Sequence, residues 1–189
     1  MIANKLTKSV VITGGSGTGK TTLCRRLLTH FLLEPIPVHM TRKIRLGEIE
    51  NIDAVFLTEE EFKSNFTSGK YLQETLESTY FSSSYYGCPK EWLDLTLKGQ
   101  FTCFVSPTVN VAKKLKGEFG DKIFWIHLIA NKETLLQRMN WRETNVSRND
   151  FEQRVERAIT SVNVDDSDLI IDTSKLNAWE IFFKALVKI

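Results

Sequence analysis

GGSGTGKT, at residues 14–21, carries the pattern G-x-x-x-x-G-K-[ST] and stands between the apolar run SVVIT and an amphipathic segment. Glycines let such a loop curl so that successive backbone N–H groups face a phosphate, and the helix that follows adds its positive N-terminal end. The lysine supplies a cation between two phosphates, and the threonine hydroxyl can ligate magnesium. A glycine turn that merely joins strand to helix is the alternative, but both flanks favour a phosphate-binding loop. We expect a nucleoside triphosphate to bind at Gly14, Gly15, Ser16, Gly17, Thr18, Gly19, Lys20, Thr21 and Thr22, with Thr21 as metal ligand.

Apolar β-type runs alternate with helical patterns along the rest of the chain, which predicts an α/β fold: a parallel sheet with helices on both faces. The expected strands cover residues 9–13, 37–40, 101–105, 123–129 and 169–171. The expected helices cover residues 21–33, 109–116, 132–141, 151–162 and 178–187. We expect the first strand, first helix and second strand to form one βαβ unit. Asn131 and Asn177 are placed to cap the helices that follow them.

Residues 42–88 interrupt this alternation with short runs, glycines and a serine turn. Thr58 and Glu61 have capping-box spacing at the start of a short helix. Residues 70–75 and 79–86 are β-rich and are expected to pair as a hairpin. The sequence therefore predicts one domain, residues 1–189, with a small mixed lobe inserted at residues 42–88.

Composition and charge exclude several classes of protein. Of the 189 residues, 42% are hydrophobic and 25% are charged, which fits a globular domain rather than a disordered chain. The net charge of +2 gives no overall field for nucleic acid or an anionic membrane, and no apolar run approaches the about 20 residues of a bilayer span. Three cysteines without CxxC spacing predict reduced thiols. With no signal peptide pattern at the start, we expect a cytoplasmic protein without nucleic-acid or membrane partners.

Together with the loop, three further features resemble the guanylate kinases over nearly the whole chain. They are Thr41-Arg42-x-x-Arg45-x-Gly47-Glu48, Tyr85-Tyr86-Gly87, and the arginines Arg138, Arg142 and Arg154. The resemblance implies that residues 42–88 form an acceptor-binding lobe and that residues 141–150 form an arginine-bearing lid. It also implies an enzyme that uses ATP and Mg2+ to phosphorylate a small phosphorylated acceptor, with GMP favoured, acting as a monomer or homodimer.

The resemblance also assigns roles to residues. The counterparts of Arg42, Arg45 and Tyr86 hold the acceptor phosphate, and that of Glu48 lies near the reacting phosphates and magnesium. Two guanidinium groups can clamp a phosphate bidentately and fix the acceptor oxygen in line with the γ-phosphorus. A solvated basic loop is the alternative for these arginines. The catalytic set implied by the resemblance is Lys20, Arg42, Arg138, Arg142 and Arg154. The last three are expected to take up charge on the transferring group, although surface arginines on two amphipathic helices are an equal alternative.

Several positions depart from the family pattern. Gln73 stands where guanylate kinases read guanine with a glutamate, and a one-residue slip would give that role to Glu74. An amide offers one acceptor and one donor, so half of the carboxylate's pairing with guanine becomes a mismatch. Val38, Ala54 and Cys88 each replace a residue with a hydroxyl group. The strand at residues 101–105 ends in Ser106-Pro107-Thr108, where the family places aspartates.

Three hypotheses about function stay open at this point. The first is phosphoryl transfer from ATP to GMP. The second is the same chemistry on another acceptor, such as a different nucleotide or ribose 1,5-bisphosphate. The third is a silent nucleotide-binding or scaffold module, against which the intact Lys20 and Thr21 argue. The reaction needs no general base because a phosphate oxygen is already anionic, so His30, His39 and His127 are interpreted as structural, and Asp53, Asp165, Asp166 and Asp172 receive no role.

Overall fold

The computed structural model describes residues 6–72, 80–81, 84–106, 108–142, 156 and 164–189. Four parallel strands form the main sheet, in the order β6 (Cys103–Val105), β1 (Ser9–Gly14), β7 (Ile123–Ile129) and β8 (Leu169–Asp172). Most residues of β1 and β7 are buried, as expected for the inner strands of a parallel sheet covered on both faces. In the register of this pair, Thr13 lies opposite His127, and Gly14 lies opposite Leu128.

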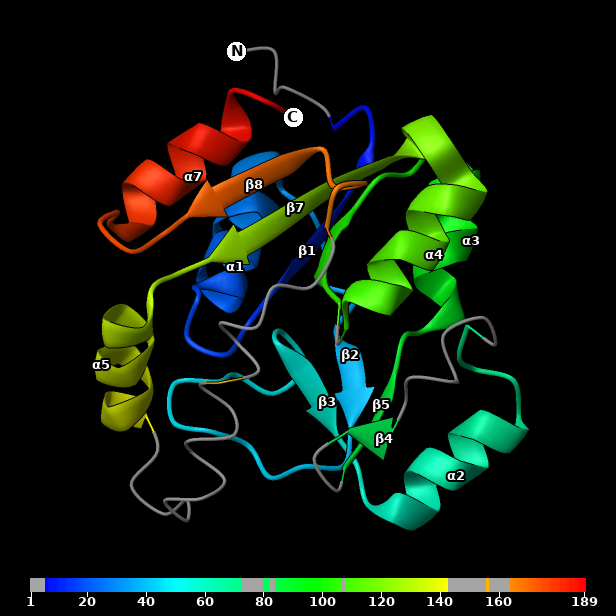
Figure 1. The fold of residues 1–189 in the computed structure, drawn as a ribbon. Helices are drawn as coiled ribbons and strands as arrows, with labels where there is room; N and C mark the ends of the chain where they lie inside the picture. Colours follow the sequence, from blue (N-terminus) through cyan, green and yellow to red (C-terminus); the bar gives the residue numbers. More distant parts are fainter. Residues whose placement is uncertain (1–5, 73–79, 82–83, 107, 143–155, 157–163) are drawn as a thin grey trace.

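Helices cover both faces of the sheet (Figure 1). On one face, α1 (Lys20–Phe31) and α7 (Ala178–Leu186) bury Leu27 and Phe182 against Val10 and Ile12 of β1. On the other face, α4 (Val109–Phe119) and α3 (Lys90–Leu97) pack against Val11. The short η2 (Gly120–Lys122) leads into β7, and α5 (Lys132–Arg142) follows it. The predicted α/β fold is therefore confirmed.

A second sheet forms the inserted lobe, with the order β3 (Ala54–Phe56), β2 (Val38–Met40), β5 (Ser84–Gly87) and β4 (Tyr80–Phe81). The β2–β3 pair is parallel and the other two pairs are antiparallel, so the predicted mixed pairing is confirmed. Next to this sheet lies α2 (Glu59–Thr67), which begins with the predicted capping box of Thr58 and Glu61. The predicted caps Asn131 and Asn177 also accept hydrogen bonds from the first turns of their helices.

The predicted βαβ unit is wrong, because β2 does not join the main sheet. Strand β1 already has β6 and β7 as its two neighbours, so it has no free edge for β2. The helix ends at Phe31, followed by Leu32 in the left-handed conformation, and Pro35 and Pro37 carry the chain toward the lobe. Residues 38–40 then pair with residues 54–56 and 86–87.

The predicted hairpin pairs differently where the structure describes it, and its residues 73–79 and 82–83 lie outside the described residues. The described hairpin joins β4 to β5, and Tyr71 instead forms an isolated bridge with Pro89. Gly87 makes this packing possible, because a Cβ atom there would lie 2.8 Å from the ring of Tyr71.

One described helix, α3, escaped the sequence analysis. The sequence pattern that could have predicted this helix is Pro89 at the N-cap, followed by Trp92 and Thr96, which are buried and four residues apart. Almost all of the helix predicted at residues 151–162 lies outside the described residues. In the described part of the chain, no helix is both long and apolar enough to cross a bilayer.

Candidate active site

The loop after β1 has a backbone that only glycine accepts at key points. Gly14 has a φ of 144°, and a Cβ atom there would lie 2.3 Å from the carbonyl oxygen of Leu128. Gly17 and Gly19 also have positive φ values, 81° and 98°. The loop therefore passes tightly against β7 and adopts the glycine-dependent curvature that a phosphate cradle requires.

Side chains inside the loop reinforce this shape. The buried hydroxyl of Thr18 donates to the Gly15 carbonyl oxygen at 2.9 Å, and Lys20 Nζ donates to the same oxygen at 2.8 Å. Helix α1 begins at Lys20 without a side-chain cap, and Thr21 lies in its first turn. The first-turn N–H groups and the Thr21 hydroxyl thus suit a phosphate with a bound magnesium ion. Among the described residues, no cluster of three or more His, Cys, Asp or Glu side chains could hold a metal ion by itself.

At the end of β6, where the resemblance would place aspartates, Ser106 and Thr108 make hydrogen bonds at the start of α4. Ser106 is buried, and its hydroxyl donates to the Thr108 carbonyl oxygen at 2.8 Å. Thr108 in turn accepts a hydrogen bond from the backbone N–H of Val111, which caps α4. These contacts account for the serine and threonine as structural residues.

The segment after β2, residues 41–50 and called the arm below, is built around an ion pair between Arg42 and Glu48. The guanidinium donates to both carboxylate oxygens, at 2.6 and 2.8 Å, and the side chains are only 14% and 10% exposed. Glu48 also accepts a hydrogen bond from the backbone N–H of Arg45 at 2.9 Å. The side chain of Tyr86 hydrogen-bonds Arg42 from β5. The structure therefore brings Arg42, Arg45 and Tyr86 together with Glu48, and it adds that Glu48 orients Arg42.

Electrostatics keep this pair ionised. Burial alone would raise the pKa of Glu48, but the hydrogen bond and charge of Arg42 outweigh it, so the pKa lies below its ordinary value. Burial alone would likewise lower the pKa of Arg42, but the contacts with Glu48 raise it. Each charge thus stabilises the other, and the arm carries a fixed guanidinium at neutral pH.

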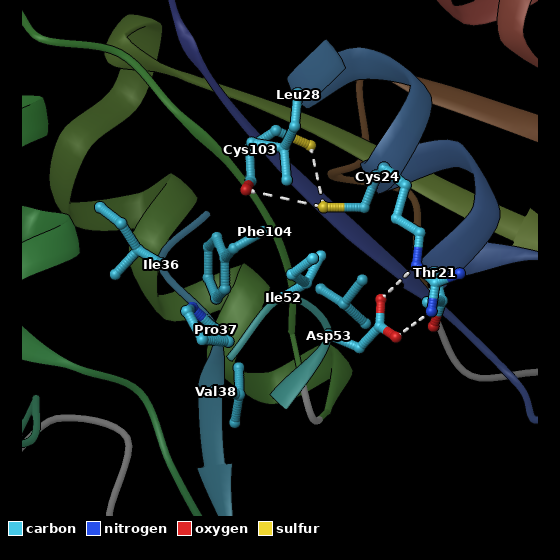
Figure 2. Close-up of a pocket in the computed structure, with 12 residues that line it drawn as sticks. Thr21, Cys24, Leu28, Ile36, Pro37, Val38, Ile52, Asp53, Cys103 and Phe104 are labelled. Atoms are coloured by element: carbon cyan, nitrogen blue, oxygen red, sulfur yellow. Dashed lines mark hydrogen bonds and ion pairs between the residues drawn. The ribbon is translucent and has the colours of Figure 1, made fainter. Parts of the chain in front are cut away.

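A second ion pair ties this arm to the phosphate-loop helix, and the sequence analysis missed it. Arg25, one turn after Thr21 in α1, donates through Nε to Asp53 at 2.6 Å and through a terminal nitrogen to the Gly47 carbonyl oxygen at 2.9 Å. The same terminal nitrogen also contacts the second oxygen of Asp53. Figure 2 shows Asp53 pointing toward the turn of α1 that carries Thr21. No local pattern marks this pair, because 28 residues separate its members.

Arg138 in α5 reaches the phosphate loop directly. It donates to the Gly17 carbonyl oxygen at 3.2 Å and to the Thr173 hydroxyl and carbonyl oxygens at 3.0 and 2.8 Å. A Cβ atom on Gly17 would also contact Met139 of the same helix. The arginine therefore fixes α5 against the loop beside β8.

Comparisons with known proteins agree with this arrangement. The family model described as "Guanylate kinase" matches residues 6–186. The chain belongs to the guanylate kinase family. It is 29% identical to the guanylate kinase of Prochlorococcus marinus over 84% of this chain and 82% of that one, and 30% identical to the Streptococcus mutans guanylate kinase over 91% and 82%. Membership in the guanylate kinase family makes the chain a nucleoside monophosphate kinase-like transferase, whose reaction is ATP-dependent phosphoryl transfer.

Solved structures support the fold of this guanylate kinase family member. The Anaplasma phagocytophilum guanylate kinase superposes with a TM-score of 0.68 at 19% identity, covering 97% of this chain and 85% of that one. A gluconokinase from Sinorhizobium meliloti gives 0.56 at 12% identity, covering 98% and 93%. At these identities the likeness extends to the fold alone.

Three positions distinguish the acceptor lobe of this family member. Val38, Ala54 and Cys88 are all buried at 4% exposure or less, and burial raises the pKa of the Cys88 thiol to about 12. These side chains therefore present apolar or neutral groups where the family pattern has hydroxyls. Other predicted site features lie outside the described part of the chain: Gln73, Glu74, Arg154, residues 143–150 of the lid and the side chain of Arg142.

Proposed function

We propose that this chain transfers the γ-phosphoryl group of ATP to the phosphate of GMP. The observation that carries the proposal is the prearranged arm, in which Glu48 fixes the buried guanidinium of Arg42 next to Arg45 and Tyr86. A guanidinium that is already oriented loses little conformational entropy when it binds a phosphate. Arg42 would thus hold the acceptor phosphate in line with the γ-phosphorus, which is the main contribution of a protein to this reaction.

The donor half supplies the remaining groups. Lys20 would bind the β- and γ-phosphates, and the backbone N–H groups of residues 14–19 would donate hydrogen bonds to their oxygens. Thr21 would hold magnesium, which when bound neutralises charge on the phosphates. Arg138 would fix the loop from α5, with Arg142 and Arg154 as the proposed lid arginines that stabilise the transferring group. Because the acceptor oxygen is anionic, the chain needs no general base.

A second acceptor remains a candidate because of what lines the lobe. Val38, Ala54 and Cys88 offer no hydroxyl group from their buried positions, so GMP would lose the hydrogen bonds that hydroxyl groups at these positions would make to its base or its phosphate. A site that pairs polar groups rejects a partner that leaves them unpaired. The phosphate-binding arginines, combined with the departures at Gln73, Val38 and Ala54, favour a different nucleotide, or ribose 1,5-bisphosphate, as the alternative acceptor.

The test is magnesium-dependent release of ADP from ATP with each acceptor supplied separately. The acceptors are GMP, AMP, IMP, CMP, UMP and ribose 1,5-bisphosphate, and the blank is the Lys20→Ala variant. Turnover with GMP that exceeds all others supports the proposal. Faster turnover with another acceptor would replace GMP in the proposal. Gln73, Val38 and Ala54 would then be the positions to change to the residues of the family pattern. No Lys20-dependent turnover with any acceptor would remove the kinase proposal in both forms.

A further inference from the structure

A buried hydrogen-bond chain links β1 and β7 directly below the phosphate loop. Trp125 Nε1 lies 2.7 Å from Thr13 Oγ1, which lies 2.8 Å from His127 Nδ1. All three residues are buried, and Thr13 lies opposite His127 in the strand register. This geometry gives His127 a defined set of partners, although the sequence analysis interpreted it only as structural.

The distances in this hydrogen-bond chain indicate where each proton lies. An indole N–H can only donate, so Thr13 Oγ1 accepts from Trp125 and has its own proton to give. Its two possible acceptors are His127 Nδ1 at 2.8 Å and the Ile126 carbonyl oxygen at 3.5 Å. The shorter distance is ideal for an O–H donor, whereas the longer one is at the limit of a hydrogen bond. The shorter contact favours donation from Thr13 to Nδ1, and in that arrangement the ring proton of neutral His127 lies on Nε2.

The strand register places His127 at the end of β7 that lies beside the phosphate loop. Thr13 is followed by Gly14, and His127 is followed by Leu128, whose carbonyl oxygen is the atom that a Cβ on Gly14 would strike. Burial, together with the positive charge of nearby Lys20, lowers the pKa of His127 to about 4. At neutral pH the ring is therefore uncharged and carries one N–H group beside the lysine.

The outer nitrogen of the ring is available to a ligand. In the described part of the chain, the buried side-chain atoms without a hydrogen-bond partner are Arg26 Nε, Trp92 Nε1, Thr102 Oγ1 and Ser167 Oγ. Within the described residues, the side-chain hydrogen bond of His127 is the one at Nδ1, and the residue is 9% exposed. A ring N–H next to the phosphate-loop lysine suits an anionic ligand.

We propose that His127 donates its Nε2–H to the phosphate chain of the nucleotide bound at the phosphate loop, a contact that rests on the proposed function. Thr13 and Trp125 act as positioning residues that hold the ring in the donating tautomer. No bond is made or broken by His127, and its proton stays on Nε2. The contact adds a neutral donor to the cationic ones of Lys20.

Two substitutions at His127 distinguish the contribution of Nε2–H from that of Nδ1. His127→Asn retains an acceptor at the position of Nδ1 for Thr13 but lacks a group that reaches the position of Nε2. His127→Gln extends an amide N–H to about the position of Nε2. Because the two amides differ by one methylene group, they form a matched pair with opposite predictions. Thermal unfolding of both variants shows whether each is folded before any comparison.

The main measurement is the Kd of ATP by calorimetry, with kcat/KM for ADP formation as the second. We expect His127→Asn to weaken ATP binding by about tenfold to a hundredfold, as for a lost hydrogen bond to a charged group. We expect His127→Gln to stay within about threefold of the wild-type Kd. Equal Kd values for wild type and a folded His127→Asn would overturn the proposal. A folded His127→Gln variant that binds ATP as weakly as His127→Asn would also overturn the proposal, because its amide N–H would then have failed to restore ATP affinity.

Nitrogen NMR of the wild-type protein tests the proton assignment without any ligand. The ring nitrogens of a neutral histidine have different chemical shifts when protonated, so the spectrum reports the tautomer. A proton on Nε2 supports the inference, and a proton on Nδ1 refutes it. A wild-type protein that binds ATP but turns over no acceptor would remove the proposed function alone, because the Kd comparison still decides the role of His127.

Discussion

The phosphate loop and the acceptor lobe hold their shapes by different kinds of contact. Residues 14–21 are shaped by backbone conformations that only glycine adopts easily and by the close approach of Leu128, so contiguous sequence determines the loop. The lobe instead depends on side-chain pairs, one of which joins Arg42 to Glu48 and another Arg25 to Asp53. The comparison teaches that a substitution in the loop meets a backbone constraint at once, whereas a substitution in the lobe acts mainly through the ion pair that it breaks or spares.

The largest effect should follow from breaking the backbone of the loop. Gly14→Ala forces a Cβ atom to within 2.3 Å of the Leu128 carbonyl oxygen at a φ of 144°. We expect the free energy of unfolding to fall by about 2–4 kcal/mol and kcat to fall by about a hundredfold or more. Urea unfolding and the ADP-release assay measure both.

The matched control is Gly117→Ala in α4, where a Cβ atom would meet nothing within 4 Å. Alanine in a helix interior should stabilise by about 0.5–1 kcal/mol and leave activity unchanged. If Gly14→Ala behaved like this control, the loop would not depend on its glycine backbone, and the contrast with the lobe would be lost.

The next largest effect should come from the arm. Arg42→Lys keeps the charge but removes the planar fork that meets Glu48 through two hydrogen bonds. We expect kcat/KM for the acceptor to fall by about tenfold to a hundredfold, while KM for ATP changes by less than about threefold. Steady-state kinetics with each substrate varied separately gives the two values.

Lys43→Gln is the control for that experiment, because Lys43 is the exposed neighbour of Arg42. It should leave both kinetic parameters close to those of the wild type. An Arg42→Lys variant that raised KM for ATP as much as it lowered acceptor kcat/KM would contradict the assignment of Arg42 to the acceptor half.

Sequence patterns predicted the parts of this molecule that local residues determine. The loop and the caps at Thr58, Asn131 and Asn177 each depend on residues within a few positions of one another, and the strands of the parallel sheet carry local apolar runs. The sheet that β2 joins is not determined by local residues in this way. Its three residues carry no signal of which sheet they will join, and the outcome depends on β6 and β7 occupying both sides of β1.

The same limit applies to the candidate site. The grouping of Arg42, Arg45, Glu48 and Tyr86 came from a motif resemblance, but the use of Glu48 to orient Arg42 required coordinates. The pair of Arg25 and Asp53 has no periodic or motif signal, because one member lies in a helix and the other in a loop 28 residues later. Charged residues are common on surfaces, so the sequence could not single these two out.

The link between the two regions can be tested with a double-mutant cycle on Arg25→Gln and Asp53→Asn. The pair joins α1 to the arm, and its carboxylate side chain is 5% exposed. We expect each single variant to lower the free energy of unfolding by about 1–2 kcal/mol, with a coupling energy of about 1 kcal/mol. The KM for the acceptor should rise by about threefold to tenfold, because the arm loses its anchor on the loop helix.

The exposed pair Lys63 and Glu59, with 63% and 55% exposure, provides a reference cycle. It should give a coupling energy of about 0.3–0.5 kcal/mol, as for exposed ion pairs on a helix, and no change in acceptor KM. Equal coupling energies for the two cycles would show that the Arg25 pair does not join the two halves.

The smallest effect should appear in the pH dependence of stability. Glu48 has a pKa below its ordinary value of 4.5, because the contacts with Arg42 outweigh burial. A carboxylate with a lowered pKa in the folded state contributes stability above its unfolded pKa, and that contribution is lost as the pH falls through the folded value. The free energy of unfolding should therefore fall below about pH 4.5, and Glu48→Gln should make that fall shallower.

Glu118→Gln, at an exposed position of α4, is the control and should leave the slope unchanged. Urea unfolding at several pH values between about 7 and 3 measures the slope for all three proteins. Because protonation of Glu48 also releases Arg42, the acceptor KM should rise over the same interval in the wild type and stay flat in Glu48→Gln. If stability and acceptor KM changed at clearly different pH values, Glu48 would not be the group that connects the fold of the arm to acceptor binding.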